Sequence, residues 1–352
     1  MKQLSIIIPM YNVEPYVERC LRSLENQNIP KDDYEIICIN DGSPDNSREV
    51  VRMLQGEFGN ITLLDQENMG VSVARNNGTD KAVGAYILFI DPDDYVYPEG
   101  FSQVLTMAHS RKAQVSFLGY SILGENGELN KLVFNEENSG VTHTGIDAYY
   151  LSRGKAVDDP DRMWAVLFER NFLCKHDLRY LQDVPYLEDG ELIARILCLA
   201  ERCIFDGRPF YKRTIRPGSA TNSGLFHTEK ALNGFLLAAV NLKQFQHKEK
   251  LTDGQRYFLN QPIAKFVLLA VNSTLNVPKF REYRNITKEL ANRALGRLKL
   301  KGVVRPYIYY AVAYNYFPVF FYLKAIVKEI KDTMKQALDY SPGKKKSISA
   351  QL

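Results

Sequence analysis

The chain lacks the cysteine pattern of a disulfide-stapled or zinc-binding protein. Its 352 residues include five cysteines, an odd number with no Cys-x-x-Cys pair: Cys20, Cys38, Cys174, Cys198 and Cys203. A disulfide framework or a zinc site is therefore not expected, and a reducing cytosol fits this composition best.

A long apolar run is missing from the N-terminus. The first one covers only residues 4–8 and stops at Pro9, which is too short for the core of a signal peptide. We therefore expect a cytoplasmic protein.

Two common nucleotide-binding loops are also missing. No Gly-x-Gly-x-x-Gly follows the first apolar run, and no Walker-type loop with Lys-Ser/Thr occurs. The usual dinucleotide-binding and P-loop folds are therefore excluded.

The net charge differs between the body of the chain, which is negative, and its last 74 residues, which are positive. Residues 279–352 contain sixteen Lys/Arg against five Asp/Glu, a surplus of +11, which leaves residues 1–278 at −7. This tail suggests an anionic surface as partner. Nucleic acid is not expected, because no recognition motif accompanies the charge.

The most informative stretch is an apolar run that stops on three carboxylates. Residues 85–90 read as a buried strand, and Asp91, Asp93 and Asp94 follow it directly. Open α/β folds bind ligands at the carboxyl edge of the sheet, and carboxylate oxygens suit Mg²⁺ or Mn²⁺. A turn without a ligand is the alternative. A twelve-residue calcium loop is excluded, since Tyr95 and Val96 stand where it needs an oxygen ligand and a glycine.

Strands and helices alternate through the first hundred residues. Apolar runs predict strands at 4–8, 34–39, 61–64 and 85–90, and helical spacing predicts helices at 15–27, 46–55 and 71–82. This order is typical of βαβ units and predicts an α/β fold with a mainly parallel sheet.

The pattern is less regular beyond residue 100. We expect helices at 101–110 and about 164–172, and strands at 114–120 and 205–211. A buried helix face follows residues 186–191, and the chain reads as helical from about residue 227.

The ends of the first two strands carry side chains suited to a nucleobase. Tyr11 could stack on a base and Asp41 could accept a hydrogen bond from a ring N–H. Turns and helix caps explain the same residues equally well at this stage.

Taken together, four segments resemble glycosyltransferase family 2, the inverting nucleotide-sugar transferases with a GT-A fold. They are Ser5 to Asn12, Glu35 to Ser43, Asn68 to Gly78 and Asp91 to Asp94. The resemblance implies a Rossmann-like GT-A catalytic domain over 1–225, with a nucleotide half at about 1–100 and an acceptor half at about 101–225. Residues 226–352 would form a helical, basic and aromatic-rich extension.

The resemblance also implies roles for individual residues. Pro9, Tyr11, Asp41 and Arg75 would hold the nucleotide. By family habit this is a UDP-sugar, with thymine and guanine as the alternative bases. Asp91 would meet the ribose and contribute to the metal site, where Asp93 would bind Mn²⁺ or Mg²⁺.

An inverting transfer needs a general base, and Glu188-Asp189 matches the family's later acidic motif. We expect Asp189 to be the base, with Glu188 as the second choice. The competing interpretation is that both are acidic residues favoured in the first turn of a helix.

A basic loop near the end of this region suits a lid over the diphosphate. It contains Arg213 and Arg216, and His227 follows where some relatives supply a third metal ligand. A solvated basic turn and a structural histidine are the alternatives. Trp164 is interpreted either as part of the acceptor side or as a core residue.

Aromatic residues are dense between residues 306 and 327, and lysines follow at helical spacing. This pattern suits peripheral attachment to anionic lipid rather than a membrane span, because Asn315, Pro318 and six tyrosines interrupt the run. Packing of the aromatic residues on the catalytic body is the alternative.

Three functions compete at this stage. A metal-dependent glycosyltransferase in surface polysaccharide or lipid-linked glycan synthesis is favoured. A sugar nucleotidyltransferase would need a Gly-rich basic loop where Pro9 to Asn12 stand, and a non-catalytic nucleotide-sugar or glycan-binding protein would not need both Asp93 and Glu188-Asp189.

Overall fold

The structure is a computed structural model of the 352-residue chain. It describes residues 2–124, 126–153, 161–184, 187–215, 228–248, 250–274 and 280–317, together with scattered residues between 319 and 334.

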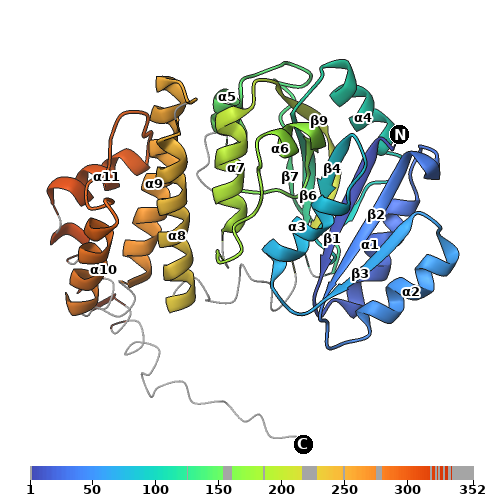
Figure 1. Ribbon diagram of the computed structural model, residues 1–352, viewed down its shortest axis with the longest axis horizontal. Helices are drawn as coiled ribbons and strands as arrows, with labels where there is room; N and C mark the ends of the chain where they lie inside the picture. The colour runs from blue at the N-terminus through green and yellow to red at the C-terminus, as the bar shows by residue number, and fades with distance from the viewer. Residues whose placement is uncertain are drawn as a thin grey trace, which may run out of the picture.

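The N-terminal part forms the predicted alternation of strands and helices (Figure 1). All seven elements expected between residues 4 and 90 are confirmed, with ends shifted by a few residues. They are β1 (Leu4–Met10), α1 (Glu14–Glu25), β2 (Tyr34–Asp41), α2 (Ser47–Glu57), β3 (Ile61–Gln66), α3 (Val71–Lys81) and β4 (Tyr86–Phe89), with a short 3-10 turn, η1 (Lys31–Asp33), before β2.

The next part adds strands of mixed direction. Its elements are β5 (Tyr95–Val96), α4 (Phe101–Ser110), β6 (Val115–Leu123), β7 (Leu129–Val133), α5 (Gly145–Leu151), β8 (Val166–Glu169), α6 (Arg170–Lys175), α7 (Glu188–Leu199) and β9 (Cys203–Thr214). The predicted helix at 164–172 is wrong, because strand β8 occupies residues 166–169 and a helix begins only at Arg170. The apolar run Met163 to Phe168 is buried from all sides, so its sequence carries no period that separates a strand from a helix.

The strands form one sheet in the order β3-β2-β1-β4-β8-β6-β9-β5, with β7 paired to β6. The first four strands are parallel, as expected. The sheet as a whole is mixed, because β8 pairs antiparallel with both β4 and β6, whereas β6 and β9 are parallel. The parallel half places the ends of β1, β2 and β4 at one edge, which is where the candidate site lies.

Both faces of the parallel half are buried, and alternate residues of each strand serve different faces. Ile6 and Ile8 of β1 belong to a core with α1, α2 and α4. Ile7 belongs to a second core with α3 and α7, and here a Cβ on Gly78 of α3 would collide with its side chain. Helix α3 is therefore held close against β1.

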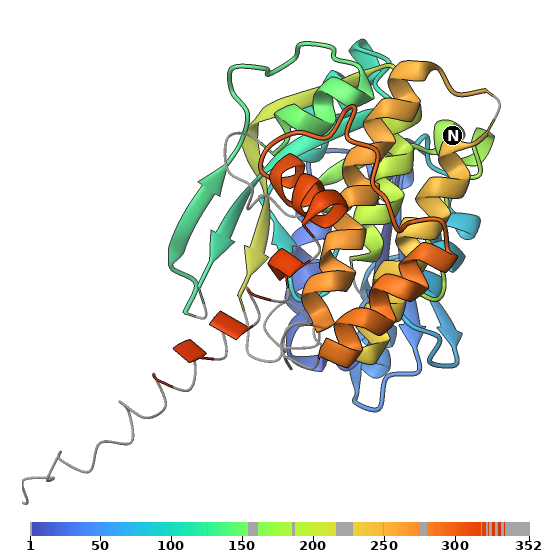
Figure 2. The ribbon, with the colours of Figure 1, turned by 90° about the vertical axis from the view of Figure 1, so that its left-hand side faces the viewer.

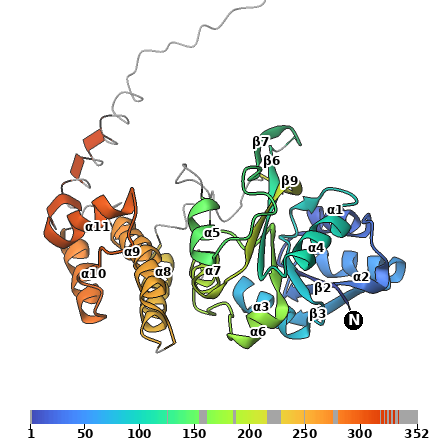
Figure 3. The ribbon, with the colours of Figure 1, turned by 90° about the horizontal axis from the view of Figure 1, so that it is seen from above.

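The second core continues into the C-terminal helices, α8 (Glu229–Gln246), α9 (Asp253–Thr274), α10 (Phe280–Asn292) and α11 (Tyr307–Tyr316). Helices α8 and α9 pack against each other and against α7, and α10 and α11 lie beyond them (Figures 1 and 3). Figure 2 shows this helical layer in front of the sheet. Helix α7 is thus enclosed between the sheet and the C-terminal helices.

The aromatic residues near the end divide between two environments. Tyr314 and Phe321 are buried in the shared core, whereas Phe317 is 63% and Tyr309 57% exposed. Within the described residues, no helix combines the length and the apolar character that crossing a bilayer requires.

Candidate functional site

The three carboxylates after β4 have different environments. Asp94 is buried; its carboxylate accepts hydrogen bonds from the Tyr211 hydroxyl (2.6 Å) and the Thr214 backbone N–H (2.7 Å). Burial raises the pKa of Asp94, and the nearby Asp93 and Asp91 raise it further. Asp94 therefore fastens the turn to β9, while the side chain of Asp93 remains half-buried at the strand end.

Arg75 of α3 is the centre of the site. This buried guanidinium donates to Asp91 Oδ1 (3.0 Å) through Nη2, and through Nη1 to Glu188 Oε1 (3.1 Å) and Asp189 Oδ1 (2.9 Å). One cation thus joins the carboxylate after β4 to the two carboxylates at the start of α7. These three acids are 16 to 114 positions from Arg75 in sequence, and the fold brings them together.

Asp189 has further partners. Its Oδ1 also accepts from the Tyr180 hydroxyl (3.1 Å), and its Oδ2 accepts from the Met163 backbone N–H (3.3 Å). The Tyr180 ring in turn lies 5.2 Å from the Arg75 guanidinium. Both oxygens of Asp189 are therefore held in fixed positions, as orientation of a proton acceptor requires.

Glu188 is held less tightly, with a single ion pair to Arg75. Burial raises the pKa of Glu188 to about 7, with a further contribution from Asp189 that Arg75 opposes. Burial also raises the pKa of Asp91, and Arg75 only partly offsets it. Three carboxylates therefore share the guanidinium of Arg75, which is a setting that favours an added cation.

The predicted nucleotide residues lie at the ends of β1 and β2. Pro9 is buried within β1, and Tyr11 follows the strand with 51% of its surface exposed. Asp41 is buried; it accepts from the backbone N–H groups of Met69 (2.8 Å) and Gly70 (2.9 Å) and from Gln66 Nε2 (2.7 Å). Asp41 therefore holds the entry to α3, the helix that carries Arg75.

The basic loop is described only in part. Arg213 lies at the end of β9, with its guanidinium 5.4 Å from the ring of Trp164. Trp164 itself is buried against Tyr120 and Tyr211, so it is a core residue. Arg216 and His227 lie outside the described residues.

The donor set fits a hard divalent cation. Asp91 and Asp93 supply carboxylate oxygens at one strand end, and the repulsion between them contributes to the raised pKa of Asp91. In the described part of the chain, no group of three or more acidic, histidine or cysteine side chains forms a metal cage by itself. Such a site agrees with the habit of Mg²⁺, which takes one or two carboxylates and completes its shell with substrate phosphates and water.

The sequence did not point to the residues that brace α7. Lys265 of α9 and Arg153 both form ion pairs with the buried Asp161, whose carboxylate lies where a Cβ on Gly190 would stand. One residue further on, Glu191 pairs with Arg195 (2.7 Å) and accepts from Asn241 of α8 (2.5 Å). These polar contacts fix the first turn of α7, and no local sequence period signals them.

Known proteins that are similar in sequence to this chain are glycosyltransferases. Residues 5–160 match the family model described as glycosyl transferase family 2. The chain is 34% identical over 198 residues to the uncharacterized glycosyltransferase EpsJ of Bacillus subtilis, covering 52% of this chain and 54% of the relative. It is 35% identical over 142 residues to a poly(ribitol-phosphate) beta-glucosyltransferase of Bacillus spizizenii, covering 40% of this chain and 22% of the relative. The chain thus spans about half the length, or less, of these relatives.

Among solved structures, the chain is similar to S. aureus TarS 1–349 in complex with UDP-GlcNAc. The TM-score is 0.69 at 20% identity, with 95% of this chain and 92% of that chain covered. The expected GT-A-like fold with a helical C-terminal part is therefore confirmed. Residues 5–160 thus match glycosyltransferase family 2, and the EpsJ relative supports the same family for this segment.

Proposed function

We propose that the protein is a metal-dependent inverting glycosyltransferase that moves a sugar from a nucleoside-diphosphate sugar to a hydroxyl acceptor. The observation that carries this proposal is the cluster in which Arg75 joins Asp91 to Glu188 and Asp189. At one edge of the sheet, Asp91 is suited to a metal ion that binds a diphosphate. Glu188 and Asp189, beside it, are suited to act as a general base.

In the proposed reaction, Asp189 takes the proton from the acceptor hydroxyl. The acceptor oxygen then forms a bond to the anomeric carbon from the side opposite the leaving group. The bond from that carbon to the phosphate oxygen breaks, and the nucleoside diphosphate leaves with the electron pair. Glu188 is the second candidate for the base, and its pKa of about 7 suits proton transfer near neutral pH.

Asp93 and Asp91 would hold Mn²⁺ or Mg²⁺, and by resemblance His227 would be the third ligand. When bound, the cation would neutralise charge on the diphosphate leaving group. The excess of buried carboxylate over Arg75 supports a cation at this place.

We propose that Pro9, Tyr11, Asp41 and Arg75 surround the nucleotide, with Asp91 at the ribose and Arg213 and Arg216 over the diphosphate. UDP is the favoured nucleotide, because the TarS structure of the same fold is a complex with UDP-GlcNAc. The exposed ring of Tyr11, at the end of β1, is suited to stacking on a base.

A cell-surface polymer is the proposed class of acceptor. The Bacillus spizizenii relative is named for glucosyl transfer to poly(ribitol-phosphate), which supports a polymer with free hydroxyl groups. Lipid-linked glycans also present free hydroxyl groups, so the proposal includes them as acceptors.

A screen of nucleotide sugars tests the donor part. Thermal stabilisation by UDP-sugars in the presence of Mn²⁺ or Mg²⁺, and its loss on chelation, is the expected result. Asp93→Asn should abolish the metal-dependent part of the stabilisation. Asp32→Asn is the matched control, because Asp32 is exposed just before β2 begins, away from the strand's carboxyl end. If no nucleotide sugar stabilises the wild-type protein with either metal, the donor proposal fails.

Two further variants test the base. Asp189→Asn should bind the donor but lower kcat by about 10²–10⁴-fold, whereas a non-catalytic binding protein would show no turnover in either form. Full turnover by Asp189→Asn together with loss in Glu188→Gln would transfer the role to Glu188.

We also propose that the C-terminal segment attaches the enzyme to an anionic membrane surface. Val319, Leu323, Val327, Ile330 and Met334 recur at helical spacing, and each is more than 50% exposed. The flanking sequence has a lysine directly after four of these five residues, which suits anionic lipid. Co-sedimentation with phosphatidylglycerol vesicles at low salt should be lost when Leu323 and Val327 are changed to Ser. Binding that is unchanged in this variant would refute the attachment.

A further inference from the structure

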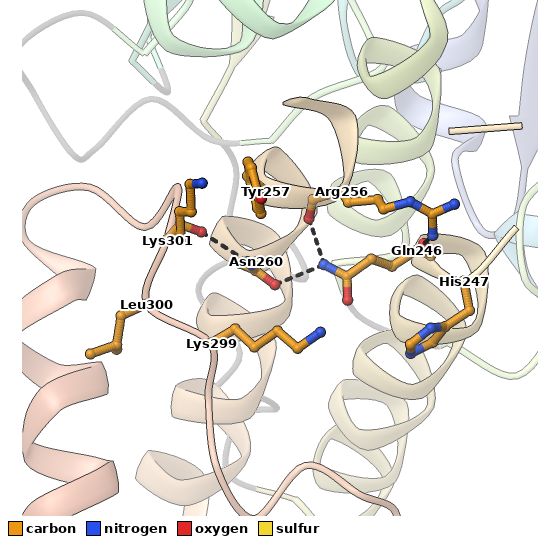
Figure 4. A pocket seen from close by; sticks show the side chains of 8 residues that line it. All are labelled: Gln246, His247, Arg256, Tyr257, Asn260, Lys299, Leu300 and Lys301. Carbon is orange, nitrogen blue, oxygen red and sulfur yellow. Dashed lines mark hydrogen bonds between the residues drawn. The ribbon is translucent and has the colours of Figure 1, made fainter. Parts of the chain in front are cut away.

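A pocket of 390 Å³ lies in the C-terminal helical layer, apart from the site described above. It is bounded by the end of α8, the first half of α9 and the extended segment after α10 (Figure 4). The residues that line it are Gln246, His247, Arg256, Tyr257, Asn260, Lys299, Leu300 and Lys301. Its volume suits a small polar molecule.

The lining is cationic and contains no carboxylate. It includes Arg256, Lys299 and Lys301, with His247 at one side. A fourth cation, Lys243, lies nearby, where burial and the charge of Lys299 lower its pKa. Positive charges gathered in this way repel one another, and a bound anion would relieve that repulsion.

The floor of the pocket is organised by hydrogen bonds. Gln246 is buried; its Nε2 donates to Asn260 Oδ1 (2.7 Å) and to the Arg256 carbonyl (2.5 Å). Asn260 Nδ2 donates to the Lys301 carbonyl (2.8 Å), which ties the extended segment to α9. Arg256 donates to the carbonyls of Gln246 (2.6 Å) and Lys248 (3.0 Å) at the end of α8. The floor is therefore preformed, and Lys299 and Lys301 are the exposed cations at its rim.

One polar atom of the floor is unused by the described residues. None of them donates a hydrogen bond to Gln246 Oε1, and Figure 4 shows both dashed lines leaving the amide nitrogen instead. This oxygen is not among the fully buried atoms that lack a partner, so it is open to the pocket and can accept a hydrogen bond from a ligand. A ligand that brings a hydroxyl group beside its negative charge would supply one.

We propose that this pocket binds a hydroxyl-bearing phosphate ester, with its phosphate between Lys299, Lys301 and Arg256 and a hydroxyl on Gln246. The lysines act as point charges toward the phosphate, as lysine does in many phosphate sites. The Tyr257 ring, 3.8 Å from the Lys301 ammonium, holds that cation at the mouth of the pocket.

The pocket is distinct from the catalytic cluster. Gln255, next to Arg256, donates to the carbonyl of Cys198 (2.8 Å) at the C-terminal end of α7. Glu188 and Asp189 stand at the other end of that helix, about 15 Å away at 1.5 Å per residue. A ligand here would therefore be bound independently of the nucleotide sugar.

Calorimetric titration of the full chain with glycerol 3-phosphate, without metal or donor, tests the proposal. We expect saturable binding in the wild type that weakens by about tenfold or more in the double variant Lys299→Gln/Lys301→Gln. The matched control is Lys230→Gln/Lys288→Gln, which removes two exposed lysines of α8 and α10 and should bind as the wild type does. Both variants change surface side chains, and a thermal melt confirms that each is folded.

Two more titrants identify the source of the phosphate. Inorganic phosphate should bind more weakly than glycerol 3-phosphate, because it lacks the polyol hydroxyls. A second outcome is that glycerol 3-phosphate does not bind, whereas phosphatidylglycerol vesicles bind the wild type and not the double variant. This result would mean that the pocket binds the phosphate of a lipid headgroup. If none of the three binds, or the control variant loses binding equally, the pocket is not a phosphate site. Because no donor is present, this failure is separate from failure of the proposed transferase activity.

Discussion

Lys265 of α9 forms an ion pair with Asp161, and that carboxylate stands directly against Gly190 in the first turn of α7. Both side chains are largely buried, with 17% and 2% exposure. Burial raises the pKa of Asp161, but Lys265 and Arg153 outweigh this effect and hold the pKa below its ordinary value. The C-terminal helices thus contribute a charge beside the turn that carries Glu188 and Asp189.

Removing that charge should weaken both the fold and the site. In Lys265→Met, Asp161 keeps its ion pair with Arg153, and we expect a loss of about 2–4 kcal/mol in unfolding free energy. The turnover number should fall more than donor affinity, because the start of α7 shifts. Chemical denaturation and steady-state kinetics measure the two effects. Lys288→Met, on an exposed position of α10, is the control and should change neither.

Glu188 should make stability depend on pH. Its folded pKa of about 7 exceeds its ordinary value of 4.5, so the fold favours the neutral acid. This contribution is complete below pH 4.5 and is lost as the pH rises through 7; the loss is at most about 3 kcal/mol. Glu188→Gln stays neutral throughout. The melting temperature of this variant should therefore gain on the wild type between pH 5 and pH 8 in the presence of a chelator. A constant difference across that range would contradict the prediction, and Glu57→Gln, at an exposed position, serves as control.

Two glycine variants should have opposite effects on stability. A Cβ at Gly190 would collide with Asp161, so Gly190→Ala should destabilise by about 1–3 kcal/mol. A Cβ at Gly56 in α2 meets nothing within 4 Å, so Gly56→Ala should stabilise by about 0.5–1 kcal/mol. Urea unfolding of the two variants measures both. Destabilisation of equal size at the two positions would show that contact with Asp161 is not the cause.

Tyr180→Phe removes one hydroxyl from the site and keeps the ring beside Arg75. Asp189 then loses one of its fixing hydrogen bonds but keeps those from Arg75 and Met163. We expect kcat to fall about tenfold with little change in the KM for the donor, since Tyr180 would act through Asp189, the proposed base. Tyr150→Phe, whose hydroxyl donates to the Gly302 carbonyl far from Asp189 in sequence, is the matched control. A change confined to KM would place Tyr180 in donor binding instead.

The sequence predicted well the parts that depend on local periodicity. The alternation from β1 to β4 and the carboxylates after β4 follow from apolar runs that end abruptly, and the structure has them in the expected places. The segment from Met163 to Phe168 was mispredicted as helix because a fully buried run carries no period.

The sequence could not predict the contacts that assemble the site from distant parts. Arg75 and Asp189 are 114 residues apart, and Asp161 and Lys265 are 104 apart. These pairings depend on how α3, α7 and α9 pack against one another, and local patterns in the sequence do not predict that packing. Resemblance to a family supplied the role proposed for Asp189, but it did not point to Tyr180 or Lys265.

Asp41 accepts two hydrogen bonds from the backbone that leads into α3, and Arg75 lies in the second turn of the same helix. Under the proposed function, a nucleobase that competes for the Asp41 carboxylate would displace the start of α3 and, with it, the Arg75 guanidinium that pairs with Asp189. Under the proposed function, we expect this linkage to favour a compulsory order of substrate addition, in which the nucleotide sugar arrives before the acceptor hydroxyl meets Asp189.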